Sequence, residues 1–485
     1  MPKRNRRQFM EESMMATAAA VAASSTGTLF ADEERPSHSP NEKLGVAVVG
    51  VRGRGKSHLG AFAGRRDTEV LYVCDADRRV GGTRVEQVAK RQGRRPRFYE
   101  DLRRVLEDKR VDIVSIATPD HWHALMAIWA MQSGADVYTE IPVSHNVSEG
   151  RRVVEAARKY TRICQTGTQC RSNPGMMEAM DFVANGHLGH VKIARGLCYR
   201  RRKTMGPSGN YPVPSSVNYD LWLGPAPEAP LTRPSLHHDW RWQWSYGNGD
   251  LGNQGIHQID VARWGLGVQR LSDAVISYGG RFGNPDAGET ANTQVVVHDY
   301  GDQSLVFESR SLPSGSLCGV KVGVIFEATD GYLVMTSYDG GVAFDLDGRK
   351  IRAFQGSGNH FESFLKTVRS RNLQDLSADI EEGHLSSSLG HMANVSYRLG
   401  EFVSEDELVA RLCEFPASEN LVATFDRTRA HLTDHGVDLA SDHFRLGCPL
   451  MVDASSETFV DHDLANAMLT REYRAPFAVP QAGQV

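Results

Sequence analysis

The stretch LGVAVVGVRGRGKS, residues 44–57, decides the fold class of this chain. Its apolar run at 44–49 predicts a buried strand that closes at Gly50, and a glycine-rich turn then leads into a helix expected from Lys56. A turn of this kind presents backbone N–H groups at a helix N-terminus, where they bind phosphate. The stretch therefore predicts a nucleotide-binding loop at the start of an α/β domain.

Two nucleotide motifs fit this loop. Residues 50–57 spell the P-loop pattern GxxxxGKS, in which lysine and serine hold a triphosphate and its magnesium. Gly50 and Gly55 also take the first and last places of the dinucleotide pattern GxGxxG, although Arg52 takes the middle place and Gly53 lies beside it. The spelling alone leaves both interpretations open.

The sequence around the loop favours a dinucleotide. A second apolar run ends at Asp75, close to the roughly 20-residue spacing at which a carboxylate binds the adenosine ribose. The turns at 118–120 and 140–142 have no obvious role in a P-loop enzyme. Arg78 and Arg79 could meet a 2′-phosphate, so NAD and NADP both remain candidate cofactors.

Strands and helices alternate through residues 43–166, which we interpret as the first domain. Further strands are expected at 112–117, 136–139 and 162–166, and helices at 101–106, 121–132 and 147–160. Strands joined by single helices form right-handed parallel crossovers. We therefore expect an α/β domain built on a doubly wound parallel sheet.

After residue 166 the regular alternation of strands and helices stops, which indicates a second, α+β domain over residues 167–400. Helices are expected at 174–185, 253–264, 361–369 and 383–399, with strands at 191–198, 293–298, 304–309, 319–326, 332–336 and 341–344. Closely spaced strands predict a mainly antiparallel sheet. Residues 401–485 carry scattered helix signals, and we treat them as a C-terminal extension.

Composition limits the class of protein. The 485 residues are 40% hydrophobic and 24% charged with a net charge of −4, which is typical of a soluble globular protein and gives no sign of a nucleic-acid partner. Seven cysteines include no C-x-x-C pair, so neither a disulfide framework nor a zinc site is predicted.

Residues 1–31 have the layout of an N-terminal signal peptide. The run NRRQFM at 5–10 resembles a twin-arginine signal, and the Ala-rich run that follows is too short for a stable membrane anchor. We expect cleavage near Ala31, a polar lead-in over 32–42, and a periplasmic or extracytoplasmic location. The alternative is a basic leader with no export role.

Five motifs in order resemble the glucose-fructose oxidoreductase / inositol dehydrogenase (Gfo/Idh/MocA) family. They are the glycine-rich turn, Asp75, ATPDHWH at 117–123, YTEIP at 138–142 and GNQGIHQID at 252–260, and the resemblance covers about residues 44–400. It implies a Rossmann domain that binds NAD or NADP, and a second domain whose open sheet serves substrate binding and homo-oligomer formation. It also implies hydride transfer between a nicotinamide and a sugar, inositol or related polyol. The cofactor contacts implied are Gly50, Gly53, Arg54, Gly55, Asp75, Thr118, Pro119, Asp120, His123 and Glu140.

The same resemblance places His257 as the acid/base toward the substrate hydroxyl. Asn253 takes the place where an aspartate is expected, four residues earlier and on the same face of a regular helix. Its neutral amide cannot hold a proton as a carboxylate does. Asp260 either orients His257 or packs the helix. Of His121 and His123, at most one is expected to point into the cleft.

Ile141 is the main departure from the family pattern, which has lysine there. That lysine stabilises the developing alkoxide, and isoleucine cannot. Either another cation replaces it, or the chemistry differs, or the protein binds sugar and cofactor without turnover. Candidate cations are Arg171, the run 200–203 and Arg241.

Two alternative functions therefore stay open beside the dehydrogenase. One is a cofactor-retaining glycosidase or lyase that uses transient oxidation, and the other is a non-catalytic carbohydrate-binding protein on the same scaffold. The aromatic and histidine-rich stretch at 237–244 is either a sugar platform or cover for a long loop. Neighbouring histidines rarely converge on one ion, so no metal is predicted there.

Overall fold

The computed structural model describes residues 43–283 and 286–485. The predicted signal at 1–31 and lead-in at 32–42 lie outside the described residues. No helix within 43–283 or 286–485 is long and apolar enough to cross a membrane. The chain divides into two compact units: the first runs to Thr118 and adds Trp129–Val137 and Ser215–Trp222, and the second holds Pro119–Ile128, Tyr138–Pro214 and Leu223–Val485.

The nucleotide-binding sheet has six strands in the order β3-β2-β1-β4-β5-β6, and the pairs of β1 with β2 and β4 are parallel. Its strands are β1 (Leu44–Val49), β2 (Thr68–Cys74), β3 (Arg97–Tyr99), β4 (Ile113–Ile116), β5 (Asp136–Thr139) and β6 (Cys164–Thr166). The connecting helices are α2 (Gly55–Phe62), α3 (Arg78–Gln92), α4 (Leu102–Val105), α5 (Asp120–Gln132) and α6 (Val147–Lys159). The predicted doubly wound parallel sheet is confirmed.

The second sheet is mixed and mainly antiparallel, as predicted. Its order is β14-β13-β12-β11-β7-β10-β9-β8-β16-β15, and β7 and β10 form a parallel pair. The strands are β7 (Val191–Tyr199), β8 (Ala274–Gly280), β9 (Thr293–Asp299), β10 (Ser304–Arg310), β11 (Val322–Ala328), β12 (Gly331–Met335), β13 (Gly340–Asp345), β14 (Lys350–Gln355), β15 (Glu401–Val403), β16 (Phe444–Leu446), β17 (Leu450–Asp453) and β18 (Thr458–Phe459).

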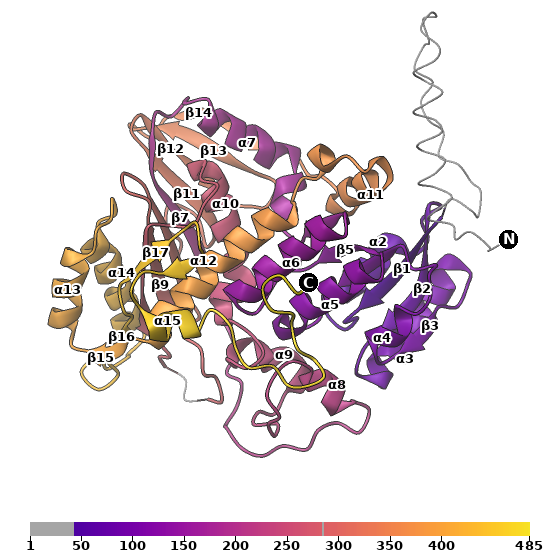
Figure 1. Ribbon diagram of the computed structural model, residues 1–485. Coiled ribbons are helices and arrows are strands. Elements are labelled where there is room, and N and C mark those ends of the chain that lie inside the picture. The colour runs from indigo at the N-terminus through magenta and orange to yellow at the C-terminus, as the bar shows by residue number, and fades with distance from the viewer. Residues whose placement is uncertain (1–42, 284–285) are drawn as a thin grey trace, which may run out of the picture. The chain divides into compact units, whose positions relative to one another are not determined.

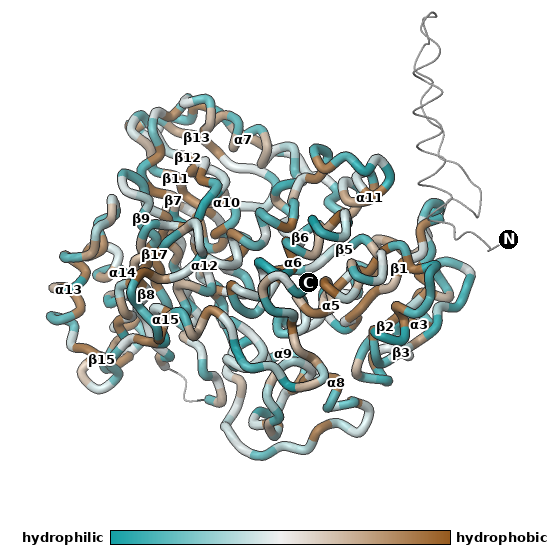
Figure 2. Tube along the Cα trace, in the orientation of Figure 1, coloured by the Kyte–Doolittle hydropathy of each residue, from teal (hydrophilic) through white to brown (hydrophobic). Residues whose placement is uncertain are grey.

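Helices cover both faces of this second sheet (Figure 1). The helices on these faces are α7 (Pro174–Ala184), α10 (Ile256–Leu266), α12 (Ile380–Arg398), α13 (Glu405–Glu414) and α14 (Leu421–Asp434). The remaining helices are α8 (Tyr219–Leu223), α9 (Leu236–Asp239), α11 (His360–Ser370) and α15 (Asp463–Ala467). The largest apolar cluster joins α7, α10 and α12 to one face, and a second joins α13 and α14 to the other. Figure 2 shows apolar residues along α5 and β8 and hydrophilic residues along α3.

The last 85 residues contribute to the second sheet itself. Strands β16 and β17 both pair with β8, and β15 pairs with β16. Because α13 and α14 lie between β15 and β16 in the chain, these strands carry both helices to one end of the sheet. The segment is therefore structurally continuous with the sheet that precedes it.

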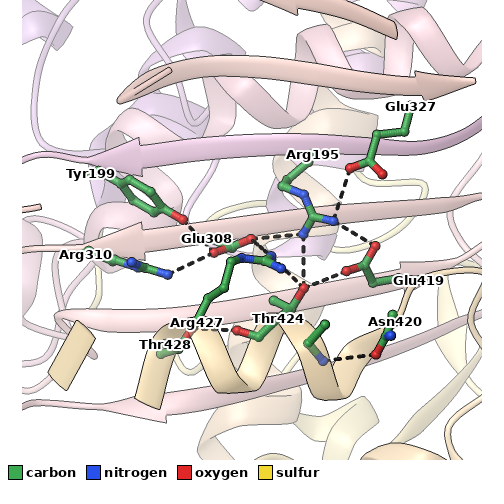
Figure 3. Close-up of polar contacts among 11 residues, drawn as sticks. Arg195, Tyr199, Glu308, Arg310, Glu327, Glu419, Asn420, Thr424, Arg427 and Thr428 are labelled. Carbon is green, nitrogen blue, oxygen red and sulfur yellow. Dashed lines mark hydrogen bonds and ion pairs between the residues drawn. The ribbon is translucent and has the colours of Figure 1, made fainter. Parts of the chain in front are cut away.

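A buried ionic network fixes α14 to the sheet (Figure 3). Arg195 on β7 reaches Glu308 on β10 at 2.9 Å and Glu419 at 2.8 Å, and Arg427 on α14 reaches the same Glu308 at 3.0 Å. Tyr199 donates its hydroxyl hydrogen bond to Glu308 at 2.7 Å. Burial opposes the charge of Glu308, but Arg195 and Arg427 hold the pKa of this carboxyl below its usual value.

Candidate functional site

The turn after β1 can only be built with glycine at two places. Gly50 has a left-handed φ of +74°, and a Cβ there would lie 2.6 Å from the backbone nitrogen of Thr118. A Cβ at Gly55, the first residue of α2, would lie 2.0 Å from the carbonyl oxygen of Gly50. At Gly53 a Cβ would meet open space among the described residues. The turn therefore leaves room for a phosphate group at the α2 N-terminus, and its residues fit a dinucleotide.

Two side chains fix the outer part of this turn. Asp75 follows β2, and its carboxylate accepts hydrogen bonds from the backbone nitrogens of Val51 at 2.8 Å and Asp77 at 2.9 Å. Arg84 on α3 donates to the carbonyl oxygens of Val51 and Arg52, both at 2.9 Å. The predicted ribose ligand Asp75 thus lies directly against the glycine turn, where Arg54 is exposed.

The residues after Asp75 bear on the choice between NAD and NADP. Arg78 forms an ion pair with Glu100 at 3.2 Å and donates to the carbonyl oxygen of Ser215. Arg79 lies on the exposed side of α3. The charged group next to the glycine turn is therefore the carboxylate of Asp75, while the guanidinium of Arg78 is paired with Glu100.

The ATPDHWH motif leads from β4 into α5, with Thr118 and Pro119 half-buried before the helix. The imidazoles of His121 and His123 are buried and contact different segments. His123 Nδ1 lies 2.6 Å from the carbonyl oxygen of Pro142, and His121 Nδ1 lies 3.3 Å from that of Tyr246. His123 thus connects this motif to the Glu140-Ile141-Pro142 turn.

Asp120 begins α5 as a buried carboxyl, 3% exposed. Burial raises its pKa well above the usual value, and Arg241 and Asn248 act in the opposite direction. Arg241 also donates to the carbonyl oxygen of His238 at 2.8 Å and lies over the Trp240 ring. Arg241, one of the candidate replacement cations, therefore interacts with a buried carboxyl group.

The turn after β5 keeps the family glutamate but buries its neighbour. Glu140 is 9% exposed and packs on Gly167, where a Cβ would come within 3.0 Å of the carboxyl group. Ile141 is 8% exposed and belongs to the largest apolar cluster, with Val147 and Cys170. Its side chain thus contributes to the core of the second unit.

The helix that carries His257 does not begin as the regular helix that we predicted. Residues Leu251–Gly255 form a π-helical turn, and α10 starts only at Ile256. Gly255 packs so closely on Phe307 that a Cβ would lie 2.8 Å from the ring. The expected regular α-helix over Asn253 is therefore wrong: Asn253 lies in the π turn and His257 in α10. Such π turns are frequent at functional sites.

His257 lies in a group of polar side chains that we call the His257 cluster: Arg200, Gln254, His257 and Tyr338. The His257 and Tyr338 rings are 5.3 Å apart, and Gln254 donates a hydrogen bond to the Tyr338 hydroxyl. Arg200 donates to the Gln254 amide oxygen at 3.2 Å. Burial raises the pKa of Tyr338 to about 12, so its phenol keeps its proton at neutral pH. The cluster joins an imidazole, a proton donor and a cation.

Asp260 has a packing role. Its carboxylate binds Arg171 at 2.9 and 3.1 Å and accepts a hydrogen bond from Ser386 at 2.8 Å. Arg171 is 7% exposed and also pairs with Glu382 at 3.0 Å. The network ties α10 to α12 and holds Arg171, one of the candidate replacement cations, in buried ion pairs.

The aromatic stretch at 237–244 is mostly cover for the loop. Trp240 and Trp242 are 7% and 5% exposed, and Arg202, which pairs with Asp250 at 2.5 Å, lies over the Trp242 ring. In the part of the chain that the structure describes, no group of three or more His, Cys, Asp or Glu side chains could hold a metal ion.

The sheet order, the glycine turn and the helix of His257 define a nucleotide-binding oxidoreductase of two domains. A family model described as "Oxidoreductase family, NAD-binding Rossmann fold" matches residues 44–168, and its companion "Oxidoreductase family, C-terminal alpha/beta domain" matches residues 202–432. The chain belongs to the Gfo/Idh/MocA family. The dinucleotide interpretation of the loop is confirmed, and the P-loop interpretation is set aside.

Curated relatives match only part of this chain. An α-N-acetylgalactosaminidase from Shewanella oneidensis is 28% identical over 202 residues, which is 39% of this chain and 44% of that protein, and other Shewanella matches are called glycosyl hydrolase family 109 proteins. The chain spans less than half the length of these relatives.

Solved structures share the fold over most of the chain. The WlbA dehydrogenase from Bordetella pertussis, in complex with NADH and UDP-GlcNAcA, is 18% identical, covers 73% of this chain and 96% of its own, and has a TM-score of 0.53. Levoglucosan dehydrogenase, in complex with NADH and levoglucosan, is 17% identical, covers 72% and 95%, and has a TM-score of 0.53.

Proposed function

We propose that this protein is an NAD-dependent oxidoreductase that transfers a hydride between the nicotinamide and a hydroxyl-bearing carbon of a sugar or polyol. The observation that carries the proposal is the His257 cluster in a chain whose family binds NAD. NAD, when bound, accepts or returns the hydride. The neighbours crystallised with NADH together with a sugar nucleotide or levoglucosan support a carbohydrate substrate.

Each residue of the His257 cluster has its own role in proton transfer or in stabilising charge. His257 takes the hydroxyl proton, because an imidazole exchanges a proton near neutral pH. Tyr338 donates a hydrogen bond to a neighbouring substrate oxygen, since its phenol stays protonated. Arg200 stabilises the developing alkoxide in place of the family lysine. The half-buried Asn253 binds a second hydroxyl through its amide.

We propose NAD rather than NADP as the cofactor, because Asp75 lies against the turn and would repel a 2′-phosphate. Asp75→Ser removes the carboxylate that is proposed to accept two hydrogen bonds from the adenosine ribose hydroxyls of NAD. Hydrogen bonds to a charged group contribute about 1.5–3 kcal/mol each. We expect at least a tenfold loss of NAD affinity and a smaller change in NADP affinity, measured by fluorescence titration. Asp67→Ser, which removes a carboxylate paired with Arg65 away from the turn, is the control. Equal losses for both cofactors would contradict the assignment.

A second candidate is a glycosidase that oxidises and then reduces its substrate within one catalytic cycle. Two observations favour it: the relatives named as glycosidases, and the buried Ile141 in place of the family lysine. The two candidates are separated by mixing the holoprotein with p-nitrophenyl α-N-acetylgalactosaminide. Nitrophenol release without net NADH supports the glycosidase, and net NADH from a free sugar supports the dehydrogenase.

Ile141→Lys tests whether the missing lysine limits net oxidation. A lysine at this place could extend its ammonium group out of the apolar cluster, because long cationic side chains keep their stems buried and their heads in polar surroundings. We expect a higher rate of polyol oxidation, measured as NADH formation. Ile141→Leu keeps the apolar contact and is expected to leave the rate unchanged. An unchanged or lower rate in Ile141→Lys counts against this account.

We also propose that the protein is exported with its cofactor bound. Twin-arginine export carries folded proteins, and free nicotinamide nucleotide is scarce outside the cytoplasm, so a tightly held NAD would be recycled on the enzyme. The proposal rests on the run NRRQFM at 5–10. Gel filtration of the exported protein should leave the cofactor bound, and rapid loss of the cofactor would overturn the idea.

A further inference from the structure

A pocket of about 310 Å³ lies within the second unit, where five segments of the chain meet. Its walls are the two residues before α6, Pro227, the loop at 244–248, the end of α12 and the segment 467–472 that begins at the end of α15. Among the described residues, those that line it include no member of the His257 cluster. It is therefore a separate cavity.

One buried and one half-buried imidazole, those of His391 and His145, line this pocket. His391 on α12 is 4% exposed, and its Nε2 lies 3.3 Å from the Ser144 hydroxyl. Neither His391 Nδ1 nor His145 Nε2 has a hydrogen-bond partner within residues 43–283 and 286–485. Each nitrogen therefore keeps the capacity for one further hydrogen bond, to a water molecule or to a polar ligand.

Two guanidinium groups stand at the same pocket. Arg471 donates to the Ser245 carbonyl oxygen at 3.0 Å and lies 3.4 Å from Glu149, yet its Nη2 has no partner in the described chain. Arg398, at the C-terminal end of α12, lies over the Trp244 ring at 5.0 Å. The pocket thus combines planar cationic donors with an aromatic wall.

Acidic side chains near the pocket partly offset these donors: Glu149 forms an ion pair with Arg471 at 3.4 Å, and Glu289 acts on Arg398. Glu149 is fully buried, and its carboxylate already accepts hydrogen bonds from the His145 backbone at 2.8 Å and the Asn146 amide at 3.0 Å. Glu472 is exposed to solvent. Burial lowers the pKa of His391 to about 3, so its imidazole is neutral at pH 7 and can serve as an N–H donor.

We propose that this pocket is a second binding site and that it takes a monosaccharide acid. Arg398 and Arg471 bind the carboxylate, since a guanidinium pairs with a planar carboxylate through two parallel hydrogen bonds. The imidazoles of His145 and His391 bind the ring hydroxyls. The volume is near the lower limit of about 300 Å³ for small-molecule pockets, which suits one sugar ring.

Isothermal titration of the full-length holoprotein with D-glucuronate, D-glucose and inorganic phosphate tests the proposal. We expect D-glucuronate to bind at least tenfold more tightly than either of the other two. Arg398→Met and His391→Gln should each weaken D-glucuronate binding at least tenfold. His431→Gln, a control at a histidine on α14 outside the pocket, should leave the affinity unchanged. Arg398 lies at an exposed helix end, so its variant remains informative if His391→Gln fails to fold.

Four results would overturn the proposal. Equal binding of D-glucose would remove the role of the carboxylate, and equal binding of phosphate would remove the role of the sugar. Unchanged D-glucuronate affinity in Arg398→Met would place the ligand elsewhere. Loss of that affinity in His257→Ala would place it at the His257 cluster, whereas a catalytically inactive His257→Ala that still binds D-glucuronate supports a separate site.

Discussion

Replacing His257 with alanine is expected to lower kcat for sugar or polyol oxidation by about 10²–10⁴-fold, the usual contribution of a positioned general base. The imidazole lies beside the Tyr338 ring in the His257 cluster, and a half-buried alanine there removes the proton acceptor without disturbing the core. KM should change much less than kcat, because Arg200 and Tyr338 still bind the substrate. Stopped-flow and steady-state measurements of NADH at 340 nm check both constants.

The matched control is His435→Ala. His435 follows α14, where its Nδ1 lies 2.7 Å from the carbonyl oxygen of His431, and it has no part in the proposed chemistry. Its variant should keep wild-type kcat. A His257→Ala enzyme with unchanged kcat would contradict the assigned role, and one with a raised KM alone would reduce His257 to a substrate-binding residue.

Replacing Arg195 with methionine is expected to destabilise the second unit by about 3–5 kcal/mol, the range for removing one partner of a buried ion pair. Arg195 is 4% exposed and joins Glu308 and Glu419, so its loss leaves carboxylates in the core between the sheet and α14. Urea denaturation followed by tryptophan fluorescence measures the change. Arg429→Met, at an exposed pair on the same helix, should cost less than about 1 kcal/mol.

The pH dependence of this effect has a definite sign. In the wild type the pKa of Glu308 is lower in the folded state, so its ionised form stabilises the fold above the unfolded pKa, and that stability is lost as the pH falls. In Arg195→Met the carboxyl is protonated more readily. The stability difference between the two proteins should therefore shrink below about pH 4.5. A difference that stays constant down to pH 3 would contradict the electrostatic origin.

Five of the six strands of the first sheet were predictable because their signals are local, whereas the three-residue β3 was not predicted. An apolar run closed by glycine or aspartate marks β1 and β2, and the predicted bounds of β1 and β5 are those of the structure. Strand β14 was missed although its residues 350–353 alternate between polar and apolar; it is an edge strand in which only Phe354 is buried. Strand β8 was missed as well, although all its residues are buried.

The site was only partly predictable, because its decisive contacts are distant in sequence. His257 follows from its motif, and Arg200 belongs to the run 200–203 named as candidate cations. Tyr338 belongs to no motif, and both Tyr338 and Arg200 meet Gln254 only in the folded chain. The π turn at Leu251–Gly255 ends at Gly255, which packs closely against Phe307 on β10. The hydrophobic pattern of the sequence carries no information on these long-range contacts, so a regular helix was predicted at 253–264.

The central claim is that this chain holds NAD for chemistry at a sugar hydroxyl, and one measurement tests it most directly. The protein is purified without added nucleotide, denatured, and its released nucleotide is identified and quantified by mass spectrometry, with a titration of NAD into any fraction that lacks nucleotide. The account predicts NAD⁺ or NADH near one per chain, or saturable NAD binding by the empty fraction. Release of ATP or GTP, or no binding of NAD by the empty protein, would contradict it.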